Sequence, residues 1–332
     1  MRKTEAVVFV EPRKVEVREI PLPELGDEDV LIEMEYSSIS IGTERWCLTG
    51  KLREPGKPLM TPFPHIPGYQ AAGVVKEIGD KVQGLSPGDR VFNAGTRVAA
   101  SWTGSCWGGH AHHHVGDYRN VVKLPADVST MEASGLLLAQ VGYNGASKPR
   151  IEHGDTAIVI GDGLVGQWAA QAFRARGAHV IMSGHHSSRL EIAKKYSADE
   201  VINSGETDFA ALIRKRYPNG VPIAAETASK SSLVKMAVSL LKYEGQFVLL
   251  GYYPEGECLI DIHWIRAAET TVYCPNASKK DRLEATLRLV AQGKMHIQEM
   301  VTHTFPYAQA ADAYRLLLEK PSEFLGIVLN WE

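Results

Sequence analysis

The chain shows two successive patterns of apolar and polar positions. From residue 4 to residue 124, short stretches such as EAVVFVE and KVEVREI alternate apolar and polar side chains, and Pro and Gly separate them. Alternation with a period of two is typical of strands with one buried face, and turn residues at this spacing favour hairpins. This half of the chain therefore predicts a β-rich domain, either barrel-like or sandwich-like.

After Pro125 the pattern changes to alternating strands and helices. The stretch 129–146 predicts a helix, with Ser129 or Thr130 as its N-cap. The six strands that follow are predicted in TAIVIG, HVIMSG, DEVINS, PIAAETA, QFVLLG and TTVYC, with helices between them over 165–177, 187–197, 209–217 and 231–244. Continuous apolar strands are typical of a parallel sheet covered on both faces. The second half therefore predicts a doubly wound α/β Rossmann sheet.

A glycine motif at the first turn of this sheet predicts dinucleotide binding. Gly161, Gly163 and Gly166 stand in G-x-G-x-x-G spacing between an apolar strand and a helix that begins near Leu164 and Val165. The first glycine allows the tight turn, the second lets the backbone approach a pyrophosphate, and the third lets the helix pack on the strand. The helix N-terminus then offers N–H groups to the phosphates.

The end of the second strand indicates which dinucleotide is bound. NAD-preferring sites usually place Asp or Glu there, on the ribose 2′-hydroxyl. No acid occurs in this stretch, where Ser183, Gly184, His185, Ser188 and Arg189 stand instead. A carboxylate would repel a 2′-phosphate, so its absence favours NADP over NAD, with NAD still possible.

Composition and charge exclude several other classes of protein. The 332 residues are 44% hydrophobic and 23% charged, which is typical of a globular protein with two domains. A net charge of −3 without a basic block argues against nucleic acid and membrane surfaces as partners. The start lacks the apolar core of a signal peptide, and the four cysteines form no C-x-x-C pair. We therefore expect a cytoplasmic protein with reduced thiols.

Several motifs together resemble the medium-chain dehydrogenase/reductase superfamily. The resemblance rests on GDRVF, IPGYQAAGVVKEIGDKV, GGHAHH, VVKLP, GDGLVG and HTFPYAQAADAYRLLLEK, and it extends over nearly the whole chain. It implies a GroES-like catalytic domain over residues 1–138 and a Rossmann domain over 139–274. It also implies that residues 275–332 return to the catalytic domain.

The segments that hold catalytic zinc in relatives differ in this chain. In zinc-dependent members, the segments that resemble SISIGTE and PGYQ carry a Cys and a His ligand. The corresponding residues here are Ile41 and Tyr69, with Gln70 in place of a Glu, and a third ligand would fall near Leu137. Such side chains do not provide the ligand set that zinc requires. The chain thus resembles the zinc-independent branch typified by bacteriochlorophyllide-type hydroxyethyl dehydrogenases, and no zinc is expected.

The histidines of GGHAHHHVG are the remaining metal candidate. On a regular strand, His110, His112 and His114 would face one way and His113 the other. Three histidines on one face could bind a metal, but a polar strand face is the commoner arrangement, and no second segment supplies an obvious ligand.

Catalysis without zinc would depend on hydroxyl and carboxyl groups. The resemblance implies that Thr43 bonds the substrate hydroxyl and that Tyr69 points into the same cleft. A phenol is poorly matched to neutral pH unless a neighbour lowers its pKa, and Glu44, Gln70 and one of the histidines of residues 110–114 are the available neighbours. Alternatively, Tyr69 only lines the pocket and Glu44 forms a surface ion pair. We expect catalytic roles for Thr43, Tyr69 and Glu44.

Aromatic residues are expected to line the substrate pocket, and the fifth Rossmann strand is expected to end at the nicotinamide. The pocket candidates are Trp46, Trp102, Trp107 and Tyr143, beside Gln70 and His110, and the nicotinamide candidates are Gly251 and Tyr252.

Three functions are compatible with these residues. The first is an NAD(P)-dependent alcohol dehydrogenase or ketone reductase that acts on a polyol, a sugar derivative or a ring-bearing alcohol. The second is a zinc-free quinone or enone C=C reductase, which often has N-x-x-D where this chain has ISIGTERW. The third is a non-enzymatic cofactor-binding redox sensor. The residues favour the first, with a small molecule as substrate.

The last predicted Rossmann strand also bears on assembly. TTVYC is apolar and forms an edge, and an uncovered apolar edge favours pairing across a two-fold axis. We expect a homodimer joined along this strand, or a tetramer built from it.

Overall fold

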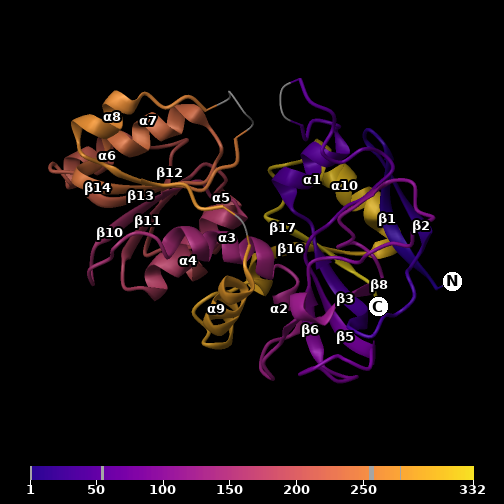
Figure 1. The fold of residues 1–332 in the computed structure, drawn as a ribbon. Helices are drawn as coiled ribbons and strands as arrows, with labels where there is room; N and C mark the ends of the chain where they lie inside the picture. Colours follow the sequence, from indigo (N-terminus) through magenta and orange to yellow (C-terminus); the bar gives the residue numbers. More distant parts are fainter. Residues whose placement is uncertain (1, 54–55, 254–257, 277) are drawn as a thin grey trace. The chain divides into compact units, whose positions relative to one another are not determined.

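The computed structural model describes residues 2–53, 56–253, 258–276 and 278–332, which form two compact units (Figure 1). The first unit contains the chain up to Leu137 together with Ile297–Glu332, and the second contains Leu138–His296. Among the described residues, no helix has the length and the apolar character needed to span a membrane.

Two sheets form the first unit, which confirms the β-rich prediction. The smaller sheet has the order β2-β1-β4-β7, and the larger one has the order β16-β17-β3-β5-β6-β9 with β8 paired to β3. The strands are β1 (Lys3–Glu11), β2 (Lys14–Pro21), β3 (Asp29–Ser38), β4 (His65–Ile66), β5 (Ala71–Ile78), β6 (Arg90–Asn93), β7 (Ser105–Cys106), β8 (His113–Asp117), β9 (Val122–Lys123), β16 (Val301–Pro306) and β17 (Gly326–Asn330).

Helices close the core of the first unit. They are α1 (Ile41–Leu48), α2 (Thr130–Ala133), α10 (Ala310–Glu319) and the short 3₁₀ turns Tyr118–Asn120, Gln298–Met300 and Tyr307–Gln309. Tyr314 of α10 packs edge-on against Phe9 of β1, with ring centroids 4.9 Å apart, and both side chains are buried. The C-terminal return is therefore part of the core rather than an appendage.

The sequence pattern did not predict α1. Its residues follow a strand and lack a long apolar stripe, since Cys47 and Leu48 are the buried apolar members. The helix is instead fixed at its start, where the Glu44 carboxylate accepts the backbone N–H of Ser40 at 2.8 Å. Such a contact satisfies one of the N–H groups that a helix start leaves without a backbone partner.

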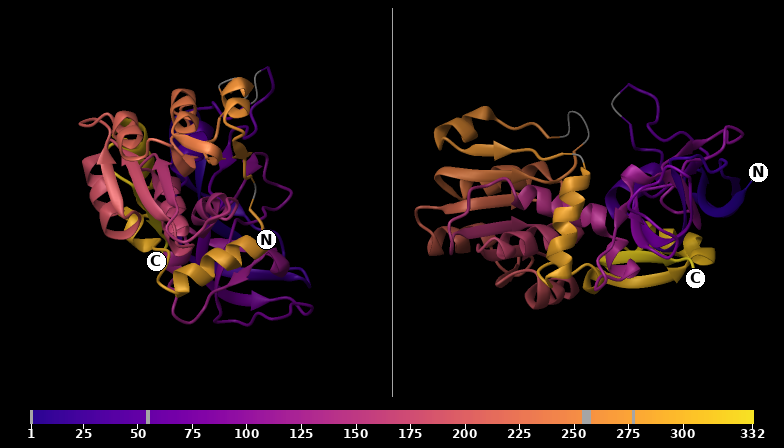
Figure 2. Two further views of the ribbon diagram at one scale, coloured as in Figure 1. Left: turned by 90° about the vertical axis from the view of Figure 1, so that its left-hand side faces the viewer. Right: turned by 60° about the horizontal axis from the view of Figure 1, so that its bottom comes forward.

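The second unit is the predicted doubly wound sheet. Its six parallel strands have the order β12-β11-β10-β13-β14-β15, which is the Rossmann order, and helices cover both faces (Figure 2). The strands are β10 (Thr156–Ile160), β11 (His179–Gly184), β12 (Glu200–Asn203), β13 (Val221–Glu226), β14 (Leu241–Leu249) and β15 (Thr271–Tyr273). The helices are α3 (Leu136–Ala146), which begins in the first unit, α4 (Leu164–Ala175), α5 (Ser187–Tyr196), α6 (Phe209–Arg216), α7 (Ser231–Ser239), α8 (Ile262–Ala267) and α9 (Lys280–Ala291).

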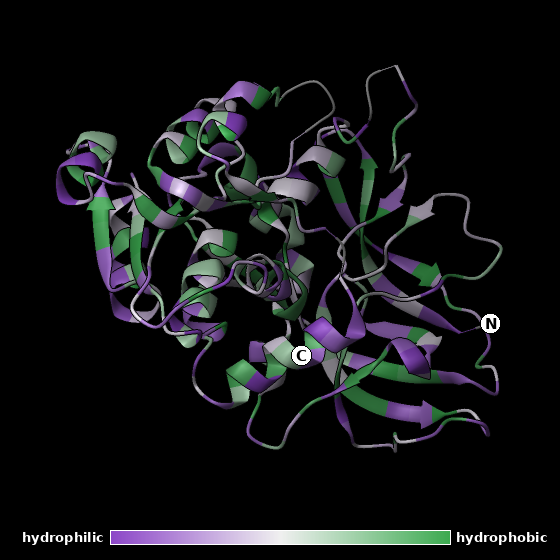
Figure 3. Ribbon diagram, turned by 60° about the vertical axis from the view of Figure 1, so that its left-hand side comes forward, coloured by the Kyte–Doolittle hydropathy of each residue, from purple (hydrophilic) through white to green (hydrophobic). Residues whose placement is uncertain are grey.

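Burial of both faces of these strands explains why their sequences are continuous apolar runs. Every residue of β10 is buried, and Figure 3 shows hydrophobic (green) segments along strands of the second unit, whereas strands of the first unit carry both green and purple segments. Side chains on both faces of a central parallel strand are covered by helices, so alternation is lost.

Two predicted helices differ from the structure. The helix expected over 129–146 is two helices, and at their junction the Ser134 hydroxyl donates to the Met131 carbonyl at 2.8 Å. Its N-cap is Ser129, in a capping box with Glu132. The helix expected to reach residue 244 ends at Ser239, and residue 244 has a positive φ of 54° that a helix does not accommodate.

The return to the first unit also begins later than expected. The stretch from residue 275 was expected to rejoin the catalytic domain, but α9 belongs to the second unit and the return begins at Ile297.

Two buried histidines in the first unit make its stability depend on pH. Burial lowers the pKa of His65 to about 4 and that of His114 to about 3. Each ring has one nitrogen bonded, to Ser105 and Asn93 respectively, and its Nε2 has no hydrogen-bond partner among the described residues. In the unfolded chain both would titrate near pH 6.5. The unfolded state therefore binds more protons between pH 6.5 and these values, and the free energy of unfolding falls as the pH falls through this window.

We expect the first unit to lose about 2 kcal/mol of stability per buried histidine between pH 7 and pH 5. Urea unfolding at the two pH values measures this loss. His114→Gln should unfold more easily at pH 7 but lose about 2 kcal/mol less on acidification. The exposed His153→Gln serves as the control and should keep the wild-type pH dependence. An equal acid loss in His114→Gln and the wild type would contradict the assignment.

Candidate functional site

Three hydroxyl groups meet at the start of α1. The Tyr69 hydroxyl donates a short hydrogen bond to Ser40 Oγ and lies 3.5 Å from Thr43 Oγ1. Gly68 places the ring: its φ is +85°, and a Cβ there would lie 2.7 Å from the His110 ring. Tyr69 and Thr43 are thus brought together as the sequence indicated, and Ser40 is a member that the sequence analysis missed.

A fully buried carboxylate, that of Glu44, supports this hydroxyl cluster (Ser40, Thr43 and Tyr69) from inside. One oxygen accepts the Ser40 backbone N–H at 2.8 Å. The other contacts His110 Nε2 at 3.0 Å and accepts a short hydrogen bond from the Tyr314 hydroxyl. A buried carboxylate is stable only with such donors. The alternative that Glu44 forms a surface ion pair was wrong.

His110 continues this network away from the hydroxyl cluster. Its Nδ1 lies 2.7 Å from Ser37 Oγ, which accepts the indole N–H of Trp331 at 2.8 Å. With Trp331 donating to Ser37, the Ser37 proton goes to His110 Nδ1 and the Nε2–H goes to Glu44. In this arrangement each donor makes one hydrogen bond, and the His110 ring carries its proton on Nε2.

The environment of Tyr69 keeps its phenol protonated. Burial raises the pKa of Tyr69 to about 12, although its hydrogen bonds with Ser40 and Thr43 act in the opposite direction. The condition under which this phenol could act as a base, a neighbour that lowers its pKa, is not met. At neutral pH the group is therefore a hydrogen-bond donor and not a base.

The histidines of residues 110–114 do not share one face. A bend at His112 precedes β8, so the regular alternation begins only at His113. His110 and His114 are buried on different partners, whereas His112 and His113 are partly exposed near Glu33. Burial, helped by His112, lowers the pKa of His113. The expected three-histidine face was wrong.

The aromatic residues that were expected to line one substrate pocket lie in different parts of the structure. Trp107 packs edge-on against Tyr69 with ring centroids 5.7 Å apart. Trp46 packs on the main core of the first unit, and Trp102 belongs to a small separate cluster. Gln70 is buried and donates to the Ser38 carbonyl at 3.2 Å. Tyr143 lies on α3 in the second unit.

The second unit holds a pocket of about 520 Å³ at the carboxyl ends of β10, β11 and β13. This is the usual ligand position of a doubly wound sheet. Its wall contains Ile160, Gly161, Asp162, Gly163, Ser183, Gly184, His185, His186, Arg189, Ser204, Thr207, Asp208, Phe209, Ala210, Thr227, Ala228, Lys230, Leu233 and Met236. Six of the twelve predicted dinucleotide residues are in this wall, namely Gly161, Gly163, Ser183, Gly184, His185 and Arg189.

The three motif glycines have the geometry that dinucleotide binding requires. Gly161 has a φ of +123°, which favours glycine. A Cβ on Gly166 would lie 2.0 Å from the Gly161 carbonyl oxygen, whereas a Cβ on Gly163 would meet nothing within 4 Å. The turn and the helix packing therefore need glycine, and the backbone at Gly163 is open to a ligand.

Asp162, which the sequence analysis passed over, organises the end of β11. Its carboxylate accepts the backbone N–H groups of His185 and His186 at 2.9 Å each and contacts the His186 ring at 3.0 Å. Arg189 Nη1 lies 3.5 Å from it. The Asp162 pKa lies below its usual range, because these hydrogen bonds outweigh its burial. A carboxylate from the glycine loop therefore lies beside the end of β11, where its oxygens bond the backbone of residues 185 and 186.

The remaining predicted cofactor residues are not in this wall. Leu164 and Val165 begin α4, and Ser188 lies in the first turn of α5. Gly251 donates its N–H to the Glu226 carbonyl at 3.1 Å, and Tyr252 is 58% exposed. Their roles stay predictions. The pocket wall also contains Asp162, His186 and Lys230, which were not predicted because only the end of the second strand was considered as the selectivity site.

Family models and known proteins agree with this architecture. Residues 26–126 match the alcohol dehydrogenase GroES-like domain, and residues 165–292 match the zinc-binding dehydrogenase domain. A 2-desacetyl-2-hydroxyethyl bacteriochlorophyllide A dehydrogenase from Cereibacter sphaeroides is 26% identical, with 99% of this chain and 98% of that protein covered. A sorbitol dehydrogenase from Halalkalibacterium halodurans is 24% identical over 95% of each chain.

Solved structures share the fold. An oxidoreductase of unknown specificity from Escherichia coli superposes with a TM-score of 0.88 at 23% identity, and 99% of each chain is covered. A zinc-binding dehydrogenase from Sinorhizobium meliloti bound to NADP superposes with a TM-score of 0.84 at 21% identity, with 99% of this chain and 100% of that chain covered. With its GroES-like domain, its Rossmann sheet and its glycine loop, the chain belongs to the alcohol dehydrogenase-like medium-chain dehydrogenase/reductase superfamily, and it is an oxidoreductase.

Proposed function

We propose that this protein is an NADP-linked oxidoreductase that interconverts a secondary alcohol and its ketone without a catalytic zinc ion. The observation that carries the proposal is the hydroxyl cluster, which replaces the ligand set of zinc-dependent relatives and is held by a buried carboxylate. The names of its relatives, among them alcohol, sorbitol and D-arabitol-phosphate dehydrogenases, support the reaction class.

The side chains at the metal-ligand positions do not fit zinc. Ile41 and Leu137 carry no donor atom, and Tyr69 offers a phenol whose pKa is raised to about 12. Zinc in enzymes is held by thiolate, imidazole or carboxylate groups. The hydroxyl cluster instead offers O–H donors, which suit an oxygen that gains negative charge.

The hydroxyl cluster would act on the reacting oxygen. NADP, when bound, supplies or accepts the hydride. In ketone reduction the carbonyl oxygen gains negative charge, and donors placed in advance stabilise that charge. Thr43 and Ser40 would donate to this oxygen, and Tyr69 would polarise Ser40 and supply the proton through it. Alcohol oxidation would follow the same path in reverse and would need the ionised form of Tyr69, so the raised pKa of Tyr69 favours ketone reduction at neutral pH.

A polyol or sugar derivative is the substrate class that we favour. Trp107 lies beside Tyr69 and offers an aromatic face of the kind on which carbohydrate rings pack. The polyol substrates in the names of several relatives point to the same class. A screen over polyols, sugars and other secondary alcohols with both cofactors tests it.

The pocket of the second unit supports NADP over NAD. Arg189, His185, His186 and Lys230 provide its cationic or proton-binding side chains. Asp162 directs its oxygens to backbone and side-chain donors around this wall, so its charge is partly neutralised. Cationic donors favour a 2′-phosphate, and Arg matches phosphate geometry particularly well.

We expect NADPH to raise the melting temperature more than NADH at equal concentration, because ligand binding to the folded state stabilises it by mass action. Arg189→Gln should weaken NADPH about 10–100-fold and leave NADH within about threefold. Thermal shift and fluorescence titration measure both effects. Gly184→Asp is unsuitable as a test, since its Cβ would lie 2.4 Å from Asp162 Oδ2.

Exposed Arg150→Gln is the matched control and should change neither affinity. Equal stabilisation by the two cofactors, or an Arg189 variant that loses NADH and NADPH alike, would contradict NADP selection.

We expect Tyr69→Phe to reduce kcat by about 10²–10³ while leaving folding and NADPH binding intact, since the ring and its packing are kept. Thr43→Val should have a similar effect. The double variant should lose less than the product of the two, because both side chains act on one oxygen. Steady-state kinetics on the substrate found in the screen measures these values. Near-full activity of Tyr69→Phe would reduce Tyr69 to a wall of the pocket.

We expect Tyr314→Phe to show that Glu44 is a positioning residue. The change removes one of the donors to a buried carboxylate and should lower the free energy of unfolding by about 1–3 kcal/mol. It should also lower kcat with little change in NADPH affinity, because the α1 start would be less firmly held. The control is Tyr307→Phe, whose hydroxyl bonds the exposed Glu5 at 2.5 Å.

That control should change stability by less than about 0.5 kcal/mol. If both variants behave alike, the buried network does not hold the α1 start in place.

A further inference from the structure

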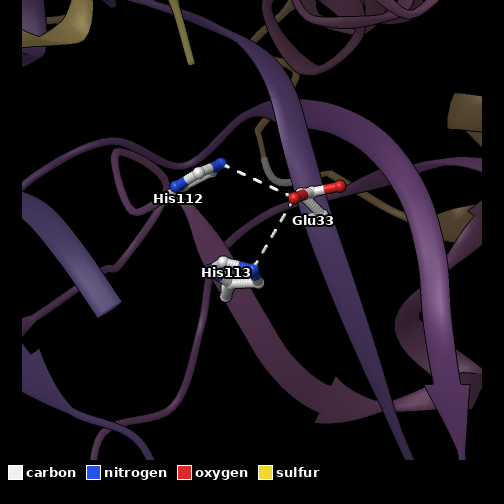
Figure 4. Close-up of side chains that lie close together, drawn as sticks. All are labelled: Glu33, His112 and His113. Carbon is white, nitrogen blue, oxygen red and sulfur yellow. Dashed lines mark ion pairs between the residues drawn. The ribbon is translucent and has the colours of Figure 1, made fainter. Parts of the chain in front are cut away.

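Two histidines and a glutamate converge on the surface of the first unit, apart from the hydroxyl cluster. His112 Nε2 and His113 Nε2 lie 4.0 Å and 3.9 Å from the same oxygen of Glu33, Oε1 (Figure 4). One ligand atom of each side chain lies within 4.8 Å of the other two. Glu33 on β3 is the second segment that the sequence analysis could not identify, because it stands 79 and 80 residues before the two histidines.

The spacing of these atoms does not correspond to direct hydrogen bonds. An N–H···O bond joins atoms about 2.9 Å apart, and contacts beyond about 3.5 Å are not hydrogen bonds. Two ligands of a tetrahedral zinc ion lie about 3.3 Å from each other, given metal–ligand distances of about 2.0–2.1 Å. The observed separations are therefore close to those across an ion and need only a small contraction.

Neighbouring groups orient two of the three ligands. Thr4 Oγ1 donates to the Glu5 carbonyl and accepts the His113 backbone N–H, and it lies 3.2 Å from His113 Nδ1. With an ion bound, the Nδ1–H would donate to the remaining lone pair of Thr4, and the Nε2 lone pair would face the ion. A metal-bound histidine usually has its other ring nitrogen held in this way.

Glu33 is oriented as well. Lys76 pairs with Oε2, the carboxylate oxygen that faces away from the histidines. Glu33 and His113 are also direct cross-strand partners in the antiparallel pair β3–β8. The Lys76 contact thus leaves Oε1 to face the histidines, and the strand register fixes the Glu33–His113 spacing.

The third ligand, His112, is oriented by the backbone bend at this residue and by the stacking of its ring. Its ring stacks on Trp331 at an interplanar angle of 22° and on Tyr307 at 28°, with centroids 6.1 Å away in both cases. This packing restricts the ring to the side on which Glu33 lies. All three side chains are partly exposed, at 38% for Glu33, 26% for His112 and 30% for His113, so an ion can enter from solvent.

We propose that Glu33, His112 and His113 form a binding site for a divalent transition metal, with Zn²⁺ as the ion that the ligands suit best. Two imidazoles and one carboxylate are a common zinc set, and water would complete the tetrahedron. The ion would join β3 to the start of β8 and thereby stabilise the larger sheet. The site shares no residue with the hydroxyl cluster, so its role is structural.

A second cluster in the described part of the chain has the same residue types but different bonding. Asp162, His185 and His186 also bring three ligand atoms together. There, however, one carboxylate oxygen already accepts two backbone N–H groups and contacts the His186 ring. This cluster is satisfied by its own hydrogen bonds, and it serves as the matched comparison.

The test is a Zn²⁺ titration of tag-free, chelator-treated and dialysed protein by isothermal calorimetry. Wild type should bind one equivalent, and its melting temperature should rise on addition of Zn²⁺. His112→Ala/His113→Ala should weaken Zn²⁺ at least about 100-fold, and Thr4→Val, which keeps all three ligands, should weaken it about 10-fold. His185→Ala/His186→Ala should bind Zn²⁺ as the wild type does.

Without zinc, the melting temperature of each variant reports whether it is folded. If the 112/113 variant retains wild-type affinity, or the 185/186 variant is the one that loses it, the proposed site is wrong. Absence of binding to wild type at millimolar Zn²⁺ would also overturn it. None of these results depends on which alcohol the protein oxidises.

Discussion

The buried carboxylate of Glu44 is the constraint on which the first unit depends. Removing a charged group from water is costly unless donors surround it. The donors here come from three parts of the chain that are distant from one another in sequence. Ser40 stands at the α1 start, His110 precedes β8, and Tyr314 lies on α10, 270 residues after Glu44. One side chain therefore joins the turn that carries the hydroxyl cluster to the C-terminal return.

This arrangement explains how a site can keep its geometry without a metal ion. In a metal site the ion itself fixes its ligands. Here the α1 start is fixed by a hydrogen-bonded network, and the Tyr69 ring is fixed by the close approach of Gly68 to His110. The hydroxyl groups are then held in place before a substrate arrives, which is what stabilisation of a developing charge requires.

Local rules predicted much of the fold. The glycine motif, the apolar strands and the Ser129 cap each depend on neighbours in the sequence, and each was confirmed. The missed features depend on long-range contacts. No local signal shows that Glu44 meets Tyr314, that Asp162 bonds the end of the second strand, or that Glu33 faces His113. The prediction that three histidines share one strand face was wrong, because the bend at His112 interrupts the alternation of side chains.

The central claim is that the hydroxyl cluster does the work that zinc does in relatives. Turnover per subunit, measured together with metal content before and after treatment with a strong chelator, tests it most directly. The account predicts that protein with less than about 0.1 equivalent of metal keeps its full kcat with NADPH, since none of the proposed catalytic groups needs an ion. Loss of turnover on chelation, with recovery on addition of stoichiometric Zn²⁺, would contradict it.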